Sequence, residues 1–475
     1  MRTATLLLML ALASLTFAQA GRVAPGTTPT ASGVPTDGNT PKTVKQLFEE
    51  ANGYRRTKYA EFQQKKIAYN ESLRQRTETE QKQLAAKYAA QAAAMTQPST
   101  EDLYYLGMLH WTADNLAGTA EALTKFLAAP DRMPEKVQGA RAIVVFVYAK
   151  QRELDRSLAV LAEYGKAGPP RMTEVWRMNA EIAKAYAASK QFDKAVVHAA
   201  KAYDAAKIAI SDPNTAVNPL DAALDAGMLL FETNRDLGRI AEADAALTDM
   251  RRIAVAVKNG SLFYYAADKL IVYQIETSRR TLANETFLNA VLQATRDLPA
   301  ASGDNDAVTR LKKREKQYKL LGSPAPELAM IDQWFPGAAK TLADLKGKVV
   351  LLDFWATWCG PCFDAFPHLA EWHQDLAGDG LVVLGMTRYY GHGEGSDPDN
   401  ASEILFLKRF KEKEKLPYDV VVAKDQETQQ AFAATSLPTT VLIDRKGVIR
   451  YIESGTNPTR IQEMREVMLK LLAEK

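Results

Sequence analysis

The sequence contains two cysteines, and their spacing could support redox chemistry. Cys359 and Cys362 stand in the motif WCGPC, between an apolar run and a stretch of helical character. Cys359 would then lie at a helix N-terminus, where free N–H groups and the helix dipole lower the pKa of a thiol. Cys362 would lie one turn further along the same face, where it could resolve a mixed disulfide formed at Cys359. The motif therefore predicts thiol–disulfide exchange.

Two other uses of the cysteine pair are open. The pair could form an inert structural disulfide, or it could supply half of a zinc site. A zinc site needs two further ligands, and only His368 and His373 are close in the sequence. A peroxidase is disfavoured, because neither cysteine stands in a Pro-x-x-x-Thr-x-x-Cys loop. We therefore expect no metal and no bound cofactor.

An acid and a proline are further candidates. Asp353 interrupts the apolar run VVLLDFW, where an unpaired carboxylate is costly to bury. Its pKa should rise, and it would then suit proton transfer near neutral pH. The alternative is a structural Asp whose hydrogen bonds are satisfied. Pro438 stands just before a second apolar run, at a position where the sheet does not need the backbone N–H that proline lacks. This position favours a cis proline in a turn over an ordinary trans proline.

The residues around these candidates alternate between strand and helix patterns. Short β-branched apolar runs are separated by stretches with helical spacing, which is typical of an α/β domain with a covered sheet. The expected strands cover 348–356, 381–387, 418–423, 439–444 and 447–454. The expected helices cover 362–377, 400–414, 425–434 and 458–474. We place this domain at 322–475 and a polar, partly helical linker at 301–321.

Residues 43–300 are expected to be all helical. Within them the pattern repeats every 38 residues when it is aligned on His110, Tyr148 and Tyr186, and small residues recur nine positions after each of these. The offsets resemble the tetratricopeptide repeat, whose stacked helices offer a concave surface to a protein partner. A plain helical bundle is the alternative. The first part, 43–95, predicts a long helical hairpin rather than a dimerising coiled coil, because its heptads are irregular.

The N-terminus carries the pattern of an export signal. Residues 1–20 contain an Arg, a short apolar run and the small-residue cleavage pattern AQA. The run is shorter than the ~20 residues that span a bilayer, so an uncleaved anchor is the less favoured alternative, and we expect no stable membrane span after processing. Residues 21–42 are rich in Gly, Pro, Thr and Ser and predict a disordered linker. The 475-residue chain has a net charge of +3, which is too balanced to suggest nucleic acid as a partner.

The cysteine motif and its surroundings resemble a known family. The sequence DFWATWCGPC resembles the active site of the thioredoxin superfamily. Three segments are similar to the exported TlpA/ResA-like branch of that superfamily: GSPAPEL at 322–328, TLADLKGKVVLLDFWATWCGPC at 341–362 and SLPTTVLID at 436–444. The resemblance covers the C-terminal third of the chain. It implies a multidomain protein in which an all-α, repeat-like region precedes an α/β thioredoxin-like fold.

The resemblance also implies a role for each matching residue. Cys359 matches the attacking cysteine and Cys362 the resolving cysteine, which together form the redox-active disulfide. Asp353 matches the buried carboxylate that accepts a proton. The residues that would contact the substrate are Trp358, which flanks the pair, Gly360 and Pro361, which tune it, and the Leu437–Pro438 loop, whose cis-proline takes the substrate backbone.

Together these patterns predict an exported thiol-disulfide oxidoreductase, located in a bacterial periplasm, that reduces disulfides of client proteins. Electrons would come from an upstream thiol protein, and the Gly-Pro between the cysteines favours a reductase over an oxidase. The alternative is a repeat-based adaptor whose thioredoxin-like domain senses redox state or docks. Two features depart from the family pattern. One is the large helical region, and the other is the long loop 389–400, in which His392 and three acidic residues predict a solvated loop rather than a metal site.

Overall fold

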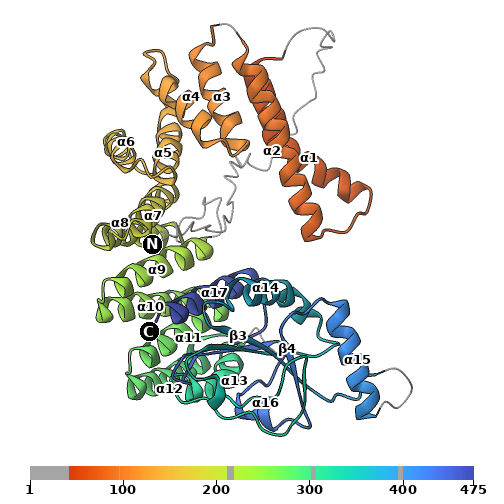
Figure 1. The fold of residues 1–475 in the computed structure, drawn as a ribbon. Helices are drawn as coiled ribbons and strands as arrows, with labels where there is room; N and C mark the ends of the chain where they lie inside the picture. Colours follow the sequence, from red (N-terminus) through yellow and green to blue (C-terminus); the bar gives the residue numbers. More distant parts are fainter. Residues whose placement is uncertain (1–41, 96, 211–218, 301–305, 394–398, 475) are drawn as a thin grey trace, which may run out of the picture. The chain divides into compact units, whose positions relative to one another are not determined.

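The computed structural model describes residues 42–95, 97–210, 219–300, 306–393 and 399–474. The expected export signal and nearly all of the expected linker after it lie outside these residues. The chain forms two compact units, Met1–Met250 and Arg251–Lys475. Figure 1 shows the helices of the first unit and the helices and sheet of the second. In the part of the chain that the structure describes, no helix is long and apolar enough to cross a membrane.

The first unit is built from helices that pack against their neighbours in the sequence. These helices are α1 Val44–Gln64, α2 Glu71–Ala93, α3 Thr100–Thr112, α4 Leu116–Ala128, α5 Pro134–Lys150, α6 Leu154–Lys166, α7 Met172–Ala188, α8 Phe192–Ile210, α9 Pro219–Asp236 and the start of α10 Ile240–Ala256. Helices α1 and α2 pack together in the region where the sequence predicts a hairpin.

Small residues lie where these helices cross. A Cβ added to Gly107 of α3 would lie 2.6 Å from the side chain of Leu123 of α4. The Oγ of Ser157 on α6 donates a hydrogen bond of 2.8 Å to the carbonyl of Val145 on α5. Such close crossings explain why small residues recur along the sequence, while the assignment to tetratricopeptide-like repeats remains a prediction.

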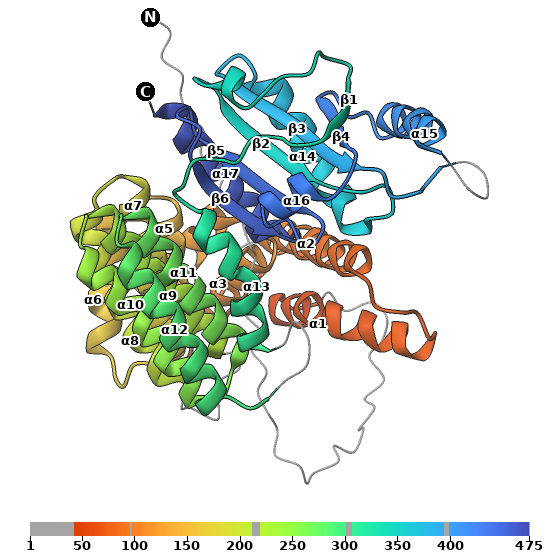
Figure 2. The ribbon, with the colours of Figure 1, turned by 90° about the horizontal axis from the view of Figure 1, so that it is seen from below.

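The second unit combines three helices with a six-stranded mixed sheet (Figure 2). The three helices are α11 Gly260–Glu276, α12 Arg280–Asp297 and α13 Ala307–Leu320. The strands are β1 Ile331–Phe335, β2 Val349–Phe354, β3 Leu381–Arg388, β4 Asp419–Ala423, β5 Thr439–Ile443 and β6 Ile449–Ser454, in the spatial order β1-β4-β3-β2-β5-β6. Strands β2, β3 and β4 are parallel, whereas β1, β5 and β6 pair antiparallel with their neighbours. The helices that lie between the strands in the sequence, or follow the last of them, are α14 Gly360–Leu376, α15 Asn400–Lys413, α16 Glu427–Ala431 and α17 Pro458–Ala473. This architecture confirms the expected fold class.

The sheet is covered on both faces, which explains its apolar strands. Every residue of β2 is buried, and Val349 and Leu351 belong to a core cluster that also holds Trp372 of α14 and Met468 of α17. Strand β1 is absent from the expected elements. Two of its five residues are exposed polar side chains at the sheet edge, so its sequence, IDQWF, lacks a continuous apolar run.

Helix α13 occupies most of the stretch that the sequence predicts as a linker. The carboxylate of Asp306 caps it by accepting a hydrogen bond of 2.8 Å from the N–H of Thr309. Its buried residues recur at the helical period and form one face; they are Ala307, Leu311, Arg314, Gln317 and Tyr318. The domain boundaries that the sequence predicts remain a proposal, but the compact unit that holds the sheet begins well before residue 322.

Arg314 is the buried charge that connects α13 to its neighbours. Its guanidinium lies 3.0 Å from the carboxylate of Asp268 on α11 and 3.0 Å from that of Glu453 on β6. The hydroxyl of Tyr318 donates a further hydrogen bond of 2.6 Å to Asp268. A buried charge that loses its partner is strongly destabilising. Helices α11 and α13 are therefore tied to the sheet by the charges that they share with it.

We predict that Arg314→Ala lowers the free energy of unfolding of the second unit by about 3–5 kcal/mol, because Asp268 would stay buried without its cation. Hydrogen exchange of the backbone amides in α11 and β6, followed by mass spectrometry, measures this loss. Lys319→Ala on the same helix is the control. Its side chain is 70% exposed, and surface pairs contribute about 0–1 kcal/mol. Equal protection in the two variants would contradict the prediction.

Candidate functional site

Strand β2 and helix α14 position the two cysteines. Cys359 is the N-cap of α14, and Gly360 and Pro361 form its exposed first turn. The two sulfur atoms are joined in a disulfide. Cys359 is 4% exposed and Cys362 is completely buried. Pro361 fits at this position because the first turn of a helix does not use its N–H. The site thus presents one edge of Cys359 to solvent and hides the second sulfur.

Asp353 lies beneath this helix. Side chains alternate along a strand, so Asp353 shares the face of β2 that carries Val349 and Leu351, and this face is covered by α14. The carboxyl group is fully buried, and its burial raises its pKa to about 7. A hydroxyl hydrogen bond of 3.3 Å from Thr440 to Oδ1 acts in the opposite direction. Among the described residues, Oδ2 has no hydrogen-bond partner. This carboxyl group can hold or release a proton near neutral pH.

The loop before β5 forms the opposite side of the site. Because β5 runs antiparallel to β2 with Thr439 opposite Phe354, the start of β5 lies at the sheet edge where β2 ends. The Leu437–Pro438 peptide bond is cis, and Leu437 packs against the cluster that contains both cysteines. Within the described residues, no hydrogen bond engages the backbone N–H or C=O of Leu437. One donor and one acceptor are therefore free at this edge.

Pro438 and Thr440 also line a small cavity, whose volume of about 10 Å³ is close to the lower limit for one water molecule.

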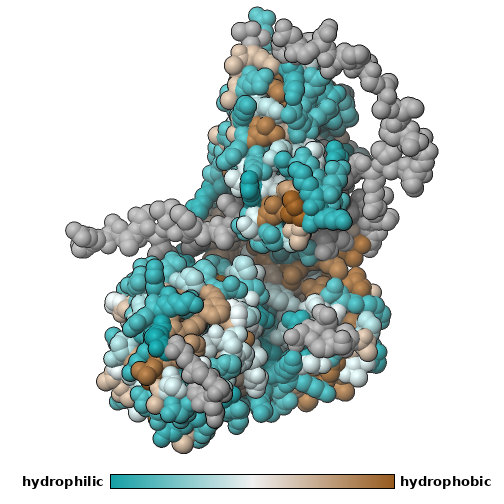
Figure 3. All heavy atoms as spheres, turned by 90° about the vertical axis from the view of Figure 1, so that its right-hand side faces the viewer, coloured by the Kyte–Doolittle hydropathy of each residue, from teal (hydrophilic) through white to brown (hydrophobic). Residues whose placement is uncertain are grey.

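Two aromatic side chains flank the disulfide. Most of the coloured surface in Figure 3 is hydrophilic. Trp358, the residue before Cys359, is a large apolar side chain that is nevertheless 53% exposed. The ring of Tyr390 meets the ring of Trp358 edge-on, with 5.4 Å between the centroids. The ring of His392 is tilted against the same indole, with 6.4 Å between the centroids. The exposed indole of Trp358, backed by the half-buried ring of Tyr390, offers apolar contact area beside the disulfide.

Tyr390 is held firmly by its surroundings. Its ring lies 3.9 Å from the guanidinium of Arg388, and its hydroxyl accepts a hydrogen bond of 3.0 Å from Gln429. The buried carboxylate of Glu403 on α15 accepts hydrogen bonds from the N–H groups of Tyr390 and Gly391, at 2.9 and 3.0 Å. The start of the loop is thus fixed by α15, while Gly391 and His392 are exposed to solvent. The expected solvated loop is described only in part, because residues 394–398 lie outside the described residues.

Sequence reasoning missed Tyr390, although a signal was present. Strands β2 and β3 are parallel, so the residues that follow them lie at the same edge of the sheet. Ligands of open α/β sheets bind at this edge. The aromatic pair Tyr389–Tyr390 directly follows β3, just as the cysteine motif follows β2.

Comparison with known proteins agrees with this geometry. Residues 320–468 match the family described as Redoxin. The chain is 31% identical over 143 residues to the thiol-disulfide oxidoreductase ResA of Geobacillus kaustophilus, a match that covers 30% of this chain and 74% of the relative. The chain belongs to the ResA-like thiol-disulfide oxidoreductases. ResA of Bacillus subtilis is 30% identical over 135 residues, with coverage of 28% and 68%. A solved thiol-disulfide isomerase from Corynebacterium glutamicum is 23% identical, with a TM-score of 0.27 and coverage of 32% of this chain and 98% of that chain.

The family match confirms the recognition of a ResA-like C-terminal third. The match to the Redoxin family begins at residue 320, so α11, α12 and nearly all of α13 precede the matched residues. The roles of the individual site residues remain proposals.

We predict that Asp353→Asn stabilises the oxidised protein at pH 8 but not at pH 4. The pKa of Asp353 rises from 3.8, its ordinary value, to about 7 in the fold. At pH values between these two pKa values, the folded protein keeps a proton that the unfolded chain has lost. The free energy of unfolding therefore falls as pH rises, and the loss is complete above about pH 7. The variant cannot titrate at this position, so its free energy of unfolding at pH 8 should exceed that of the wild type by up to about 4 kcal/mol. Melting temperatures of both proteins at both pH values test this. An equal difference at the two pH values would show that Asp353 keeps an ordinary pKa.

Proposed function

We propose that this ResA-like oxidoreductase reduces the disulfides of client proteins. The observation that carries the proposal is the asymmetry of the pair: Cys359 reaches the surface at a helix N-terminus, while Cys362 is buried. A client sulfur can approach only the first. The Gly-Pro dipeptide between the cysteines favours reduction over oxidation. The protein would use no bound cofactor, and an upstream thiol protein would reduce its disulfide again after each cycle.

The exchange would proceed in two steps. In the reduced protein, the thiolate of Cys359 attacks one sulfur of the client disulfide, and the other client sulfur leaves as a thiolate that takes a proton from water. Cys362 then passes its proton to the carboxylate of Asp353 and attacks the Sγ of Cys359. The second client sulfur leaves as a thiolate and is protonated. The client has gained two electrons, and the cysteine pair has become the disulfide.

The residues around the pair would hold the client during this exchange. The free N–H and C=O of Leu437 suit an extended client segment, because such segments bind to exposed backbone edges through main-chain hydrogen bonds. Trp358 and Tyr390 would contact the client side chains next to its disulfide. The helices of the first unit would supply a separate surface for a protein partner.

Turnover of insulin disulfides with dithiothreitol as reductant tests this function. We predict that the full-length protein accelerates insulin reduction, that Cys359→Ser abolishes the effect, and that Cys362→Ser accumulates mixed disulfides at Cys359. The two variants are matched controls, since each removes one sulfur from the same pair. A wild-type rate no faster than that of dithiothreitol alone would favour the alternative function, an adaptor that senses redox state or docks.

We also propose that the protein is exported to a bacterial periplasm, on the basis of the signal pattern in residues 1–20. The mature protein isolated from its native host is expected to begin near Gly21. Intact-mass measurement checks this, and a membrane-bound protein that retains Met1 would instead support the uncleaved anchor.

A further inference from the structure

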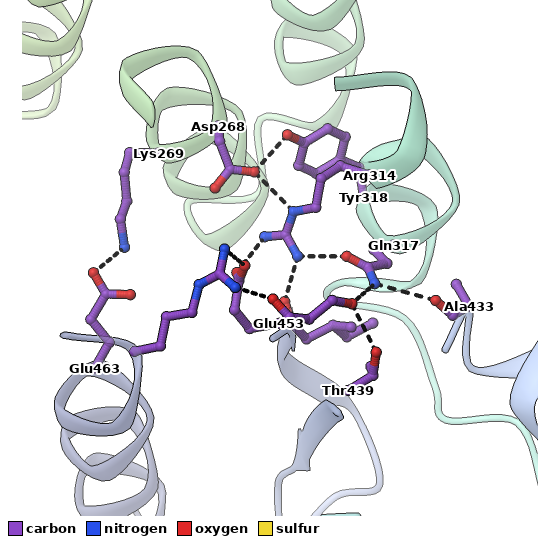
Figure 4. Close-up of polar contacts among 12 residues, drawn as sticks. Asp268, Lys269, Arg314, Gln317, Tyr318, Ala433, Thr439, Glu453 and Glu463 are labelled. Carbon is purple, nitrogen blue, oxygen red and sulfur yellow. Dashed lines mark hydrogen bonds and ion pairs between the residues drawn. The ribbon is translucent and has the colours of Figure 1, made fainter. Parts of the chain in front are cut away.

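A series of polar contacts runs from α13 to the loop that precedes β5 (Figure 4). It begins at Arg314, whose Nη1 donates a hydrogen bond of 2.6 Å to Oε1 of Gln317. Arg314 itself is fixed by its ion pairs with Asp268 and Glu453. Because a guanidinium can only donate, the contact defines the orientation of the Gln317 amide: its oxygen faces Arg314, and its NH₂ group faces the sheet.

The NH₂ group of Gln317 reaches the segment between α16 and β5. It donates to the carbonyl of Ala433 at 3.2 Å and to the Oγ of Ser454 at 3.0 Å. Ala433 has a φ of 52°, in the left-handed region, at the turn where the chain leaves α16. Gln317 is 3% exposed, so water is a poor substitute for these contacts.

Two hydroxyl groups extend the series to the loop itself. Thr439 donates its hydroxyl proton to the carbonyl of Ser436 at 2.6 Å, so it can only accept in its contact of 2.8 Å with Ser454. Ser454 must then donate to Thr439 and accept from Gln317. The direction of every hydrogen bond is therefore determined. Within the segment 433–438, the carbonyls of Ala433 and Ser436 are held by contacts that converge on Gln317, and the carbonyl of Pro438 accepts a hydrogen bond of 2.7 Å from the N–H of Gly455.

We propose that Gln317 is a positioning residue for the loop that receives the client backbone, so that α13, which precedes the family match, is part of the redox site. This inference rests on the proposed function, in which Leu437 binds the client. A free N–H and C=O bind a client strand well only if they are already in place. Both anchored carbonyls precede Leu437 in the chain, Ala433 by four residues and Ser436 by one, and they fix the loop without touching the cysteines.

Gln317→Glu is the decisive variant in the full-length protein. The carboxylate keeps an acceptor for Arg314 and nearly the same shape, but it replaces the NH₂ group that faces Ala433 and Ser454. Ser454→Ala, which removes the middle of the series, is the second variant. Tyr318→Phe is the matched control: it removes the hydrogen bond to Asp268 in the same cluster but leaves the series to the loop intact.

The assay compares two substrates of the reduced protein: insulin, which carries a peptide backbone, and DTNB, a small aromatic disulfide that does not. We expect Gln317→Glu and Ser454→Ala to lower kcat/KM for insulin by about five- to tenfold, mainly through a higher KM, since a loop that loses a buried hydrogen bond loses part of its preorganisation. The rate with DTNB should change by less than about twofold. Tyr318→Phe should keep the wild-type ratio of the two rates.

The outcomes separate the two proposals. An unchanged ratio in folded Gln317→Glu and Ser454→Ala would overturn the role of Gln317, as would an equal loss in Tyr318→Phe, which would indicate general destabilisation. If Gln317→Glu fails to fold, as judged by its melting transition, the result with Ser454→Ala decides. Wild-type protein that reacts with DTNB but not with insulin would refute the proposed function, and the loop's role would fall with it.

Discussion

The C-terminal unit depends on a guanidinium that is buried between two carboxylates. Arg314 cannot be deprotonated, so its burial requires Asp268 from one side and Glu453 from the other. Glu453 in turn lies 3.1 Å from Arg460 at the start of α17. Segments that are far apart in the sequence therefore share one set of charges. An ion pair between Lys269 and Glu463 joins α11 to α17 at 2.8 Å and adds to the same constraint.

Two buried carboxyl groups of this unit, those of Asp268 and Asp353, have opposite pKa shifts because their surroundings differ. Burial favours the neutral form of both. For Asp268, the charge of Arg314 and the hydrogen bond from Tyr318 outweigh burial, and its pKa falls below the ordinary value. Asp353 receives only a hydroxyl hydrogen bond, and its pKa rises to about 7. The first group therefore stays charged and holds helices together, whereas the second can exchange a proton at neutral pH.

The features that sequence reasoning found are those with a local pattern. The helix N-terminus at Cys359 follows from the strand and helix around it, and the raised pKa of Asp353 follows from an acid within an apolar run. The sequence predicts a linker where α13 lies, because polar residues, Arg314 and Gln317, occupy the buried face of this helix. Their burial depends on Glu453 and on Ala433, more than a hundred residues later. Tyr390 differs, since its place directly after a strand was a local signal, although the carboxylate that fixes it comes from Glu403 on the next helix.

Three sets of elements therefore support the site, and they come from different parts of the sequence. The cysteine side is built by β2 and α14, within the residues that match the Redoxin family. The aromatic side is held by Glu403 on α15, and the loop side by Gln317 on α13, which precedes that match. In the proposed function, thiol reactivity would depend on the first of these supports, and the geometry of the bound client would depend on the other two. If that function holds, changes at Gln317 or Glu403 would alter which disulfides reach Cys359 while the chemistry of the sulfur atoms stays the same.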